Sequence, residues 1–373
     1  MKIVIVSPAY PLRGGIANFT AQLYQELSLE HKVIVFNFKR QYPKLFFPGK
    51  TQLEVGENVD KIPSRIEIDS INPITWIKTA NNIIAEKPDL VIFKYWMPFF
   101  ALCYGVIAKK IKKRTKAKII AVCHNIVPHE KKPGDDFLTK YFLSRMEYFI
   151  LLSNQVENDL KKVISDPKSK ILPHPIYSRF GSAVDKQSAL DYLKLKEYNY
   201  LLFFGFIRDY KGLDVLIEAM NLIKDQDQIK LIVAGEFYED EKKYLDLIAK
   251  YNLSNKIILI KDFIPTLDVK YYFSVCDAVV LPYREATQSG IVQMAINFNK
   301  PVIAANVGGV SEVIVNDETG YIVEKENPKA LADAIKIFYT ANKKELFNKN
   351  ILHLKDKYSW KYFVSGLFDL INT

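Results

Sequence analysis

Short apolar runs alternate with amphipathic stretches from the first residues of the chain to its end. An apolar run bounded by turn-forming residues predicts a buried strand, whereas apolar residues that recur every three or four positions predict a helix. Strands that alternate with helices in units of about thirty residues indicate βαβ units, in which the strands are parallel. The sequence therefore predicts an α/β fold with doubly wound parallel sheets.

The expected elements follow from this pattern. In the first half, strands are expected at residues 2–6, 32–36, 90–93, 118–122, 148–152 and 170–172, and helices at 16–27, 73–85, 99–113, 137–146 and 155–163. In the second half, strands are expected at 200–204, 229–234, 256–260, 278–281, 301–304 and 320–323, and helices at 212–223, 239–251, 269–274, 290–297, 328–340, 343–355 and 360–370. Ligands of doubly wound sheets lie at the carboxyl ends of the strands, so functional residues are expected in the loops that follow strands.

The pattern restarts at Tyr200 after a polar stretch with few strand-forming residues. A chain of 373 residues is expected to hold two domains, because a domain usually takes roughly 100–200 residues. We predict a first Rossmann-like domain over 1–176, a linker over 177–198 and a second Rossmann-like domain over 199–357, with the two domains facing each other across a cleft. Residues 39–59 are polar and rich in aromatic residues, and they are expected to form a mobile loop of the first domain.

Several features favour a cytoplasmic protein. Cys103, Cys123 and Cys276 are dispersed and form no CxxC pair, which argues against a disulfide framework and against a zinc site. The apolar N-terminal segment ends at Ser7 and is too short for a signal peptide. The longest uncharged stretch, 95–108, is shorter than a membrane span and contains Pro98, so no transmembrane helix is expected.

The formal net charge of +10 is compatible with a nucleic acid, an anionic membrane surface or a phosphorylated substrate as partner. No recognisable motif organises this charge for nucleic acid, so that partner is not expected. The densest basic cluster ends an expected helix and comprises Lys109, Lys110, Lys112, Lys113 and Arg114, followed by Lys116 and Lys118. Two interpretations stay open: a solvated helix end whose cations complement the helix dipole, or a patch that holds the protein peripherally on a membrane.

The most informative loop follows the expected strand 278–281. It contains Glu285, and a Ser289-Gly290 pair then opens a helix that continues through Ile291 and Gln293. Backbone N–H groups at a helix start attract anions such as a diphosphate. Glu285 can accept hydrogen bonds from sugar hydroxyls, and Gln293 can reach a further hydroxyl. The alternative is an ordinary strand–turn–helix in which Ser289 caps the helix.

The next segments make this pattern specific. The letters KPVIA at 300–304 include the expected strand over 301–304, which leads to Gly308-Gly309-Val310-Ser311-Glu312, and a further strand begins at Gly320. Together with the preceding loop, these segments resemble glycosyltransferase family 4, whose members have the GT-B fold of two Rossmann-like domains. The family carries E-x7-E, then KPV[IV]A[TS], then GGxxE, and then a Gly-x-aliphatic strand.

Other segments extend the resemblance over nearly the whole chain, and they imply roles for further residues. The stretch 203–212 resembles the family's G-[RK]-x-x-x-K-G element and implies that Gly205, Arg208 and Lys211 bind the diphosphate of a nucleotide sugar. The other implied donor contacts are Gly14 and Gly15 in the first domain and Gly235, Ile264, Ser289, Gly290, Ile291 and Gln293 in the second.

The resemblance also implies that His124 lies near the transferred sugar, although a structural histidine is the alternative. His129 and Glu130, in the same loop, are candidates for the acceptor side. Residues 358–373 resemble the family's closing helix, which crosses back onto the first domain and completes it. The chain departs from the family at Gln293, where the second glutamate of E-x7-E would contact the ribose; an amide can still accept one hydrogen bond and donate others.

The implied function is that of a retaining, metal-independent glycosyltransferase that uses a UDP- or GDP-linked sugar and needs no cofactor. The acceptor would be a glycan or a lipid-linked molecule in surface polysaccharide or glycoconjugate synthesis. An inverting enzyme of this fold usually keeps a general base in the first strand-to-helix loop, but residues 7–18 contain no Asp, Glu or His. The sequence 225–227 has the Asp-x-Asp spelling of metal-dependent transferases, but it lies between a helix and a strand and is interpreted as a turn.

Two rival functions remain open at this stage. One is a nucleotide-sugar epimerase of the same fold, which needs a pair of carboxylates where only Glu285 is convincing. The other is a degenerate, non-catalytic subunit that only binds a nucleotide sugar, for which Gln293 is the main support.

Overall fold

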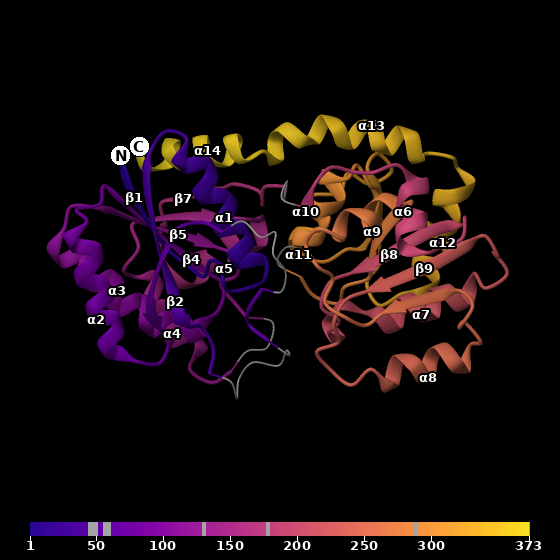
Figure 1. Ribbon diagram of the computed structural model, residues 1–373, viewed down its shortest axis with the longest axis horizontal. Coiled ribbons are helices and arrows are strands. Elements are labelled where there is room, and N and C mark those ends of the chain that lie inside the picture. The colour runs from indigo at the N-terminus through magenta and orange to yellow at the C-terminus, as the bar shows by residue number, and fades with distance from the viewer. Residues whose placement is uncertain (44–50, 55–60, 129–131, 177–179, 287–288, 373) are drawn as a thin grey trace. The chain divides into compact units, whose positions relative to one another are not determined.

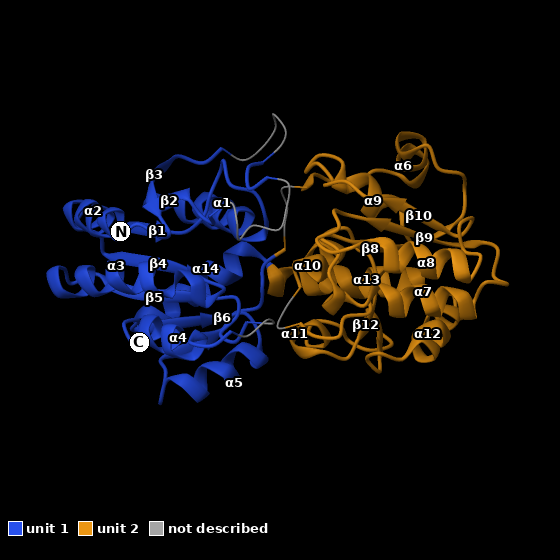
Figure 2. Ribbon diagram, turned by 90° about the horizontal axis from the view of Figure 1, so that it is seen from below, with its two compact units in different colours: residues 1–175, 359–373 blue, residues 176–358 orange. Residues whose placement is uncertain are grey.

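A computed structural model describes residues 1–43, 51–54, 61–128, 132–176, 180–286 and 289–372 of the chain. The chain forms two compact units (Figure 2). Unit 1 comprises Met1–Pro175 together with Ser359–Thr373, and unit 2 comprises Ile176–Tyr358. Each unit is an α/β domain with its own parallel sheet, and we describe the two separately.

Unit 1 contains a parallel sheet with strand order β3-β2-β1-β4-β5-β6-β7 (Figure 1). Its strands are β1 Lys2–Val6, β2 Lys32–Arg40, β3 Ser64–Asp69, β4 Leu90–Tyr95, β5 Lys118–Cys123, β6 Tyr148–Leu151 and β7 Ser169–Ile171. Its α-helices are α1 Gly15–Ser28, α2 Pro73–Ala85, α3 Ala101–Arg114, α4 Asp135–Leu143, α5 Asn154–Val163 and α14 Trp360–Asn372.

Helices cover both faces of the unit 1 sheet because the side chains of each strand alternate between the faces. In β1, Val4 and Val6 pack on the face that also receives α2, α3 and α4. Ile3 and Ile5 pack on the opposite face, against α1 and the C-terminal helix α14. The central strands β1, β4 and β5 are buried on both sides, which is why they appear in the sequence as largely apolar runs.

Unit 2 contains a second parallel sheet with strand order β10-β9-β8-β11-β12-β13. Its strands are β8 Asn199–Phe204, β9 Ile229–Ala234, β10 Ile257–Ile260, β11 Ala278–Leu281, β12 Val302–Ala305 and β13 Gly320–Val323. Its α-helices are α6 Lys186–Leu193, α7 Leu213–Leu222, α8 Lys242–Lys250, α9 Val269–Val275, α10 Gly290–Asn297, α11 Gly308–Ser311, α12 Pro328–Thr340 and α13 Lys344–Leu354.

The unit 2 sheet is also covered on both faces. Leu201 and Phe203 of β8 pack with α7, α8 and α12. Leu202 and Phe204 pack on the other face with α6, α9 and α10. In each sheet the strand order reverses at one point, between β1 and β4 in unit 1 and between β8 and β11 in unit 2. Loops that leave the carboxyl ends of these strands diverge, and ligands of doubly wound folds bind there.

The boundary between the units differs from the expected linker over 177–198. Most of that stretch belongs to unit 2, because Lys186–Leu193 forms helix α6. Ala189 and Leu190 are buried on one face of α6 and pack in the unit 2 core, and Asp185 caps the helix by accepting from the Ser188 N–H at 2.8 Å. The apolar positions of this short helix are few, so the stretch looks polar overall. At the other end of the chain, α14 belongs to unit 1 and packs on α1 through Trp360, Phe363 and Leu367.

The sequence patterns also missed β3. This strand lies at the edge of its sheet, and its polar residues alternate with Ile66 and Ile68, of which only Ile68 is buried. Strand β2 runs on to Arg40, four residues past its expected end, so residues 39 and 40 belong to a strand. Most of the loop expected over 39–59 lies outside the described residues. Within the described residues, no helix is both long enough and apolar enough to cross a bilayer.

Candidate functional site

The unit 2 residues predicted to bind the donor follow adjacent strands at the reversal point of the sheet. Gly205, Arg208 and Lys211 lie in the connection from β8 to α7, and Glu285 and Ser289 lie in the connection from β11 to α10. Strands β8 and β11 are paired neighbours. The topology therefore brings both loops to one edge of the sheet.

Lys211 is the most unusual cation of this edge because its side chain is buried, with 8% of its surface exposed. Among the residues that the structure describes, no carboxylate lies within ion-pair distance of its ammonium. Burial, together with repulsion from Arg208, lowers the pKa of Lys211 to about 7. A buried cation without a carboxylate partner is costly for the folded protein unless a ligand compensates it.

The ammonium of Lys211 lies beside Gly205, another residue predicted to contact the donor. A Cβ atom placed on Gly205 would lie 3.2 Å from the Lys211 Nζ and 3.4 Å from the Ile291 Cδ1. Gly205 in turn lies against Gly235, where a Cβ would come within 2.1 Å of the Gly205 carbonyl oxygen. The structure therefore brings Gly205, Lys211, Gly235 and Ile291 close together.

The lysine loop and the glutamate loop also touch directly through backbone atoms. Gly212 has φ +66°, and a Cβ at this position would lie 2.1 Å from the Pro282 carbonyl oxygen. In addition, the Arg284 N–H donates to the Tyr210 carbonyl at 2.7 Å. Only glycine fits at position 212, because any side chain would push the two loops apart.

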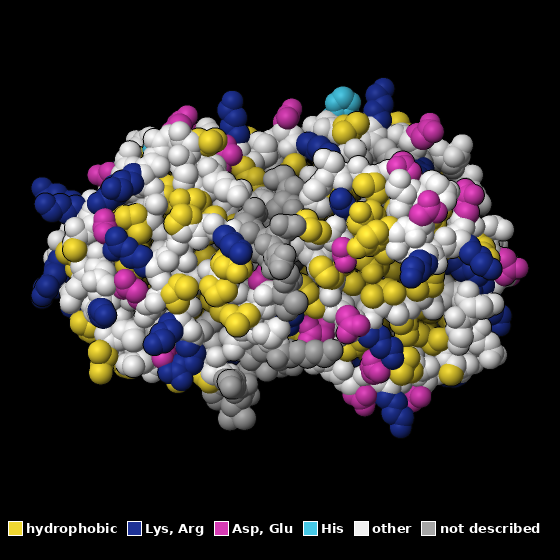
Figure 3. All heavy atoms as spheres, viewed as in Figure 1, with side chains coloured by type: hydrophobic (Ala, Val, Ile, Leu, Met, Phe, Trp, Pro, Cys, Tyr) yellow, Lys and Arg dark blue, Asp and Glu magenta, His cyan; other side chains and the backbone are white. Residues whose placement is uncertain are grey.

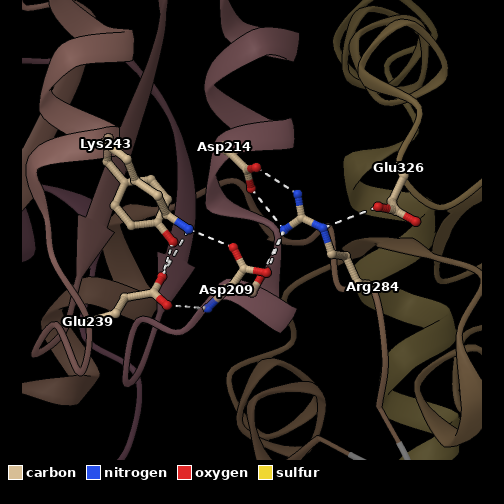
Figure 4. A network of polar contacts seen from close by, with 7 residues as sticks. Asp209, Asp214, Glu239, Lys243, Arg284 and Glu326 are labelled. Atoms are coloured by element: carbon tan, nitrogen blue, oxygen red, sulfur yellow. Dashed lines mark hydrogen bonds and ion pairs between the residues drawn. The ribbon is translucent and has the colours of Figure 1, made fainter.

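Arg284 fastens the same two loops through its side chain (Figure 4). Its Nη1 and Nη2 donate to the two carboxylate oxygens of Asp214 at 3.0 and 2.6 Å. Nη1 also donates to the backbone carbonyl of Asp209 at 2.6 Å, and Nε donates to the carboxylate of Glu326 at 3.2 Å. Paired bonds of this kind fix a planar geometry. The Asp214 carboxylate raises the pKa of Arg284 above its ordinary value. Arg284 thus holds the backbone beside Glu285, whose own side chain is exposed.

The start of α10 has the serine cap that the alternative interpretation of this loop expected. Ser289 is the N-cap, and its Oγ accepts from the Ile291 N–H at 3.2 Å. Gly290 is the first residue of the helix. Gln293 lies one turn further and is almost fully buried, and its Oε1 has no hydrogen-bond partner among the described residues. A buried, unsatisfied amide oxygen is uncommon and is explained if a ligand hydroxyl donates to it.

Aromatic residues lie beside Arg208. The guanidinium carbon of Arg208 is 5.2 Å from the centre of the Tyr238 ring, which is 4.5 Å from the centre of the Phe206 ring. Phe206 also lies 6.3 Å from Phe263 in a stacked orientation. Ile264, the predicted contact for a nucleobase, follows Phe263 in the loop after β10 and is buried.

In unit 1, the predicted glycines line a pocket at the reversal point of the sheet. Gly14 has φ +110° and precedes α1, so the helix begins without a side-chain cap. The pocket has a volume of about 160 Å³, and it is lined by Pro8, Arg13, Gly14, Gly15, Ile16, Ala17, Gln41, Tyr42, Gln52 and Trp96. These residues follow β1, β2 and β4, so the pocket lies where ligands of this fold are expected.

His124 does not line this pocket. It is 5% exposed, and its ring packs edge-on against Phe19 and His174 at centroid distances of 5.2 and 5.9 Å. Burial, with smaller contributions from Lys94 and His174, lowers the pKa of His124 well below its ordinary value. His124 is therefore neutral at physiological pH, in the surroundings of a structural histidine. His129 and Glu130 lie outside the described residues.

The basic cluster forms the exposed end of α3. Lys109, Lys112, Lys113 and Arg114 are exposed, whereas Lys110 is partly buried. Within the described ranges, Lys112 is the one of these five with an ion pair, to Glu147 at 3.9 Å. Lys and Arg side chains are found on both units in Figure 3, so the positive charge is not confined to this cluster. Three of these residues occupy the last turn of α3, as the dipole interpretation expects.

The sequence analysis did not predict several residues that the structure places at these two sites. Arg284 precedes Glu285, and Asp214 follows Gly212 by two positions, so both stood inside segments already singled out. Trp96, Tyr42 and Gln41 follow strands β4 and β2, and the rule that ligands lie at strand ends would have pointed to them. Tyr42 belongs to the stretch 39–59 that was expected to form a mobile loop, but it packs on Phe99 with a centroid distance of 5.8 Å.

Comparisons with known proteins agree with this geometry. The model of the family "Glycosyl transferases group 1" matches residues 186–350, and that of "Glycosyltransferase Family 4" matches residues 13–177. An uncharacterized glycosyltransferase of Methanocaldococcus jannaschii is 26% identical over 378 residues, which cover 98% of this chain and 97% of that protein. The capsular polysaccharide biosynthesis glycosyltransferase CapM of Staphylococcus aureus is 30% identical over 199 residues, which cover 49% of this chain and 50% of CapM.

A solved structure shares the fold over the whole chain. The crystal structure of HepE from Anabaena in complex with UDP aligns with a TM-score of 0.78 and 15% identity, covering 100% of both chains. The two family matches fall one on each Rossmann-like unit, and between them they include the loops described above. The chain therefore belongs to glycosyltransferase family 4 and is a glycosyltransferase with the GT-B fold.

Proposed function

We propose that the protein is a retaining glycosyltransferase that moves a hexose-type sugar from a UDP- or GDP-linked donor to a glycan or a lipid-linked acceptor. The donor binds at the carboxyl edge of the unit 2 sheet, and the acceptor binds to unit 1. A role in surface polysaccharide or glycoconjugate synthesis is supported by the name of the CapM relative, and a nucleotide-linked donor by the UDP bound to HepE.

The buried ammonium of Lys211 is the observation that carries this proposal. Its charge has no carboxylate partner among the described residues, and a second cation, Arg208, is close enough to lower its pKa further. Two cations at a strand-to-helix loop repel each other in the free protein. A dianionic diphosphate removes that repulsion and compensates the buried charge, so it is the ligand class that fits best.

The remaining donor contacts follow from the positions of the loops. The backbone N–H groups at the start of α10 approach the diphosphate. Glu285 accepts hydrogen bonds from hydroxyls of the transferred sugar, and the Gln293 amide bonds the ribose. The other donor contacts are Gly205, Gly235, Ile264, Ser289, Gly290 and Ile291 in unit 2, and Gly14 and Gly15 in unit 1.

The chemistry assigned to this site is a front-face displacement. The acceptor hydroxyl attacks the anomeric carbon from the side of the leaving group, the bond from that carbon to the phosphate oxygen breaks, and a phosphate oxygen takes the hydroxyl proton. Lys211 and Arg208 stabilise the developing charge on the diphosphate without a metal ion. The loop over residues 7–18 offers no carboxylate or imidazole as a general base, which favours this route over inversion. His124, being neutral, acts at most as a hydrogen-bonding group.

A lipid-linked acceptor is supported by the exposed basic end of α3. Lys109, Lys112, Lys113 and Arg114 can rest on an anionic leaflet, where each cation contributes about 1 kcal/mol at best. Several together would hold the protein peripherally on the inner face of the membrane.

A donor screen tests the proposal. UDP-glucose, UDP-galactose, UDP-N-acetylglucosamine and GDP-mannose are each incubated with the protein, with and without lipid extracts as acceptor source, and release of UDP or GDP is measured. A transferase releases the nucleotide from at least one donor, and faster with acceptor. An epimerase would convert the sugar without releasing nucleotide, and a binding subunit would bind donors without turnover. Proton NMR of the product's anomeric centre then decides between retention and inversion.

A further inference from the structure

We infer that unit 2 has an anion site at the edge of its sheet opposite the donor loops, and that this site binds a phosphate group. It consists of Lys186, Lys300 and Lys344 together with the hydroxyl of Tyr339, grouped around the carboxylate of Asp277. Inorganic phosphate and the phosphate of a phosphorylated sugar present the same strongly accepting, multiply charged group to such a site. The inference does not depend on the proposed function.

The cluster lies where strands of the unit 2 sheet begin. Asp277 directly precedes β11, and Lys300 lies two residues before β12. The loops that carry Lys211 and Glu285 leave the carboxyl ends of β8 and β11, so they lie at the other edge of the same parallel sheet. Strand β11 has four residues, which span about 13 Å at roughly 3.3 Å each. A phosphate at the cluster is therefore separate from a diphosphate bound at the donor loops.

Asp277 holds two of the lysines. It is 2% exposed, and its Oδ2 accepts from the Tyr200 N–H at 2.8 Å. Its Oδ1 accepts from the Lys344 ammonium, and the Lys186 Nζ lies 3.8 Å from the same Oδ1. Two lysines from different helices, α13 and α6, thus converge on one oxygen of a single buried carboxylate.

Lys300 adds a third cation to the cluster. Its Nζ donates to the backbone carbonyls of Ser274 and Cys276 at 3.1 and 2.7 Å, just before β11 begins. Burial is the main reason why the pKa of Lys300 is lowered, and the charges of Lys344 and Lys186 act in the same direction. The three ammonium groups therefore lie close enough to repel one another.

The cluster carries an excess of positive charge. Three lysines and one carboxylate leave two positive charges uncompensated. Asp185 and Glu345 adjoin two of the lysines in sequence, but both are exposed, and within the described ranges neither forms an ion pair with the cluster. The side chains of Lys186 and Lys344 are partly exposed, so an anion can reach them from solvent. A doubly charged anion would compensate the excess.

Tyr339, on α12, is a separate indication of a ligand. Its hydroxyl oxygen is buried and has no hydrogen-bond partner in the part of the chain that the structure describes. Burial raises the pKa of Tyr339 well above its ordinary value, and the nearby Asp277 carboxylate adds to this shift although no hydrogen bond joins the two. Buried hydroxyls are normally hydrogen-bonded. A phosphate oxygen held by the lysines would accept from the Tyr339 hydroxyl.

Equilibrium dialysis of radiolabelled inorganic phosphate against the full chain tests the inference. Donor loops that bind a diphosphate would also bind phosphate, so the titration uses Lys211→Met beside the wild type. We expect saturable binding of about one phosphate per chain in Lys211→Met, and weaker binding as sodium chloride is added, because salt screens the lysines. No saturable binding to either protein, or binding by the wild type that Lys211→Met loses completely, would overturn the inference.

Variants made in the Lys211→Met protein then locate the site. Tyr339→Phe removes only the hydroxyl, so we expect at least a fivefold loss of phosphate affinity without a lower Tm in the absence of phosphate. Lys186→Met leaves Asp277 its contact with Lys344 and should lower the affinity at least tenfold. Tyr362→Phe and Lys329→Met change exposed side chains and are the matched controls, which should bind phosphate as the parent does.

Competition identifies the source of the phosphate group. If glucose 6-phosphate displaces the label at a lower concentration than unlabelled phosphate does, the site is one for a phosphorylated sugar; the opposite order makes it a site for free phosphate. In both cases Lys186→Met should weaken the competitor as it weakens phosphate. Phosphate affinity that is the same in Lys186→Met and Lys329→Met would overturn the inference.

Discussion

Arg284 donates two hydrogen bonds to Asp214, at 3.0 and 2.6 Å, and so fixes the loop that carries Glu285 to the first turn of the helix that follows Lys211. Lysine at this position keeps the charge but cannot form the paired contact. We therefore expect Arg284→Lys to lower kcat roughly tenfold to a hundredfold, because small displacements of a positioning loop have effects of this size. The measurement is steady-state kinetics of nucleotide release. Lys343→Met, which removes a partly exposed ion pair with Asp317, is the control and should retain wild-type kcat; an equal loss in both variants would mean that Arg284 has no special role.

Gly212 offers a test of the contact between the two loops. A Cβ at this position would lie 2.1 Å from the Pro282 carbonyl oxygen, and φ is +66°. We expect Gly212→Ala to reduce the free energy of unfolding of unit 2 by about 2–4 kcal/mol, since strain of φ and a backbone clash add. Gly134→Ala is the matched control: φ there is +90°, but the new Cβ would have no neighbour within 4 Å. Denaturant unfolding should show a clearly larger loss for Gly212→Ala, and equal losses would argue that the loops separate easily.

The lowered pKa of Lys211 predicts how stability depends on pH. The unfolded chain binds the lysine proton up to a pH near 10, whereas the folded chain releases it near pH 7. Between these values the unfolded state binds more protons, so the Lys211 contribution to the free energy of unfolding rises with pH and is least favourable below pH 7. Lys211→Met should therefore stabilise the free protein most at pH 6 and least at pH 10. The exposed Lys329→Met serves as control and should show no such trend.

The lowered pKa of Lys211 also predicts that the protein takes up a proton when it binds a nucleotide. At pH 8.5 Lys211 is mostly neutral in the free protein, and a bound diphosphate favours its charged form. Calorimetry of UDP and GDP in two buffers of different ionisation enthalpy should show uptake of close to one proton by the wild type. It should show none by Lys211→Met, whose affinity should also fall. Wild-type affinity without proton uptake would mean that the diphosphate binds elsewhere.

The basic end of α3 predicts membrane binding that depends on salt. The wild type should sediment with phosphatidylglycerol vesicles at low ionic strength and detach as salt is added, because screening acts over about 8 Å at physiological strength. Reversing Lys109, Lys112 and Lys113 to Glu should abolish sedimentation. Reversing Lys224, Lys329 and Lys349, three exposed lysines of unit 2, makes the same change in net charge and should have a smaller effect. If the two triple variants sediment with vesicles to the same extent, the cluster is a solvated helix end and does not bind the membrane.

Much of the fold could be predicted from the sequence because its strands are buried on both faces. Strands such as β1 and β9 appear as short, mostly apolar runs, and their predicted bounds coincide with the observed ones. Edge strand β3 and short helix α6 were missed, since each buries only one or two apolar side chains and carries polar residues elsewhere. The hydrophobic pattern of a segment reflects how many of its side chains are buried, so an element that buries few side chains shows only a weak pattern.

The site was only partly predictable for a similar reason. The positions of Lys211 and Glu285 followed from loops after strands and from a family motif, and the structure places the two loops side by side. The burial of Lys211, the bond between Arg284 and Asp214 and the pocket around Gln41 depend on residues far apart in the sequence. No local pattern contains that information. The catalytic and donor-binding roles of these residues remain predictions.

Glu285→Ala tests the central claim most directly. The claim is that the carboxylate at the end of β11 contacts the sugar as it leaves the nucleotide. Removing a contact of this kind costs about 2.7–4 kcal/mol in the transition state, or about a hundredfold to a thousandfold in kcat. The measurement is the rate of UDP or GDP release from the preferred donor by the wild type and by Glu285→Ala, with melting curves showing that the variant is folded. We expect turnover by the wild type and a loss of at least a hundredfold in the variant, whereas turnover of the variant within twofold of the wild type, or no turnover of any donor by the wild type, would contradict the account.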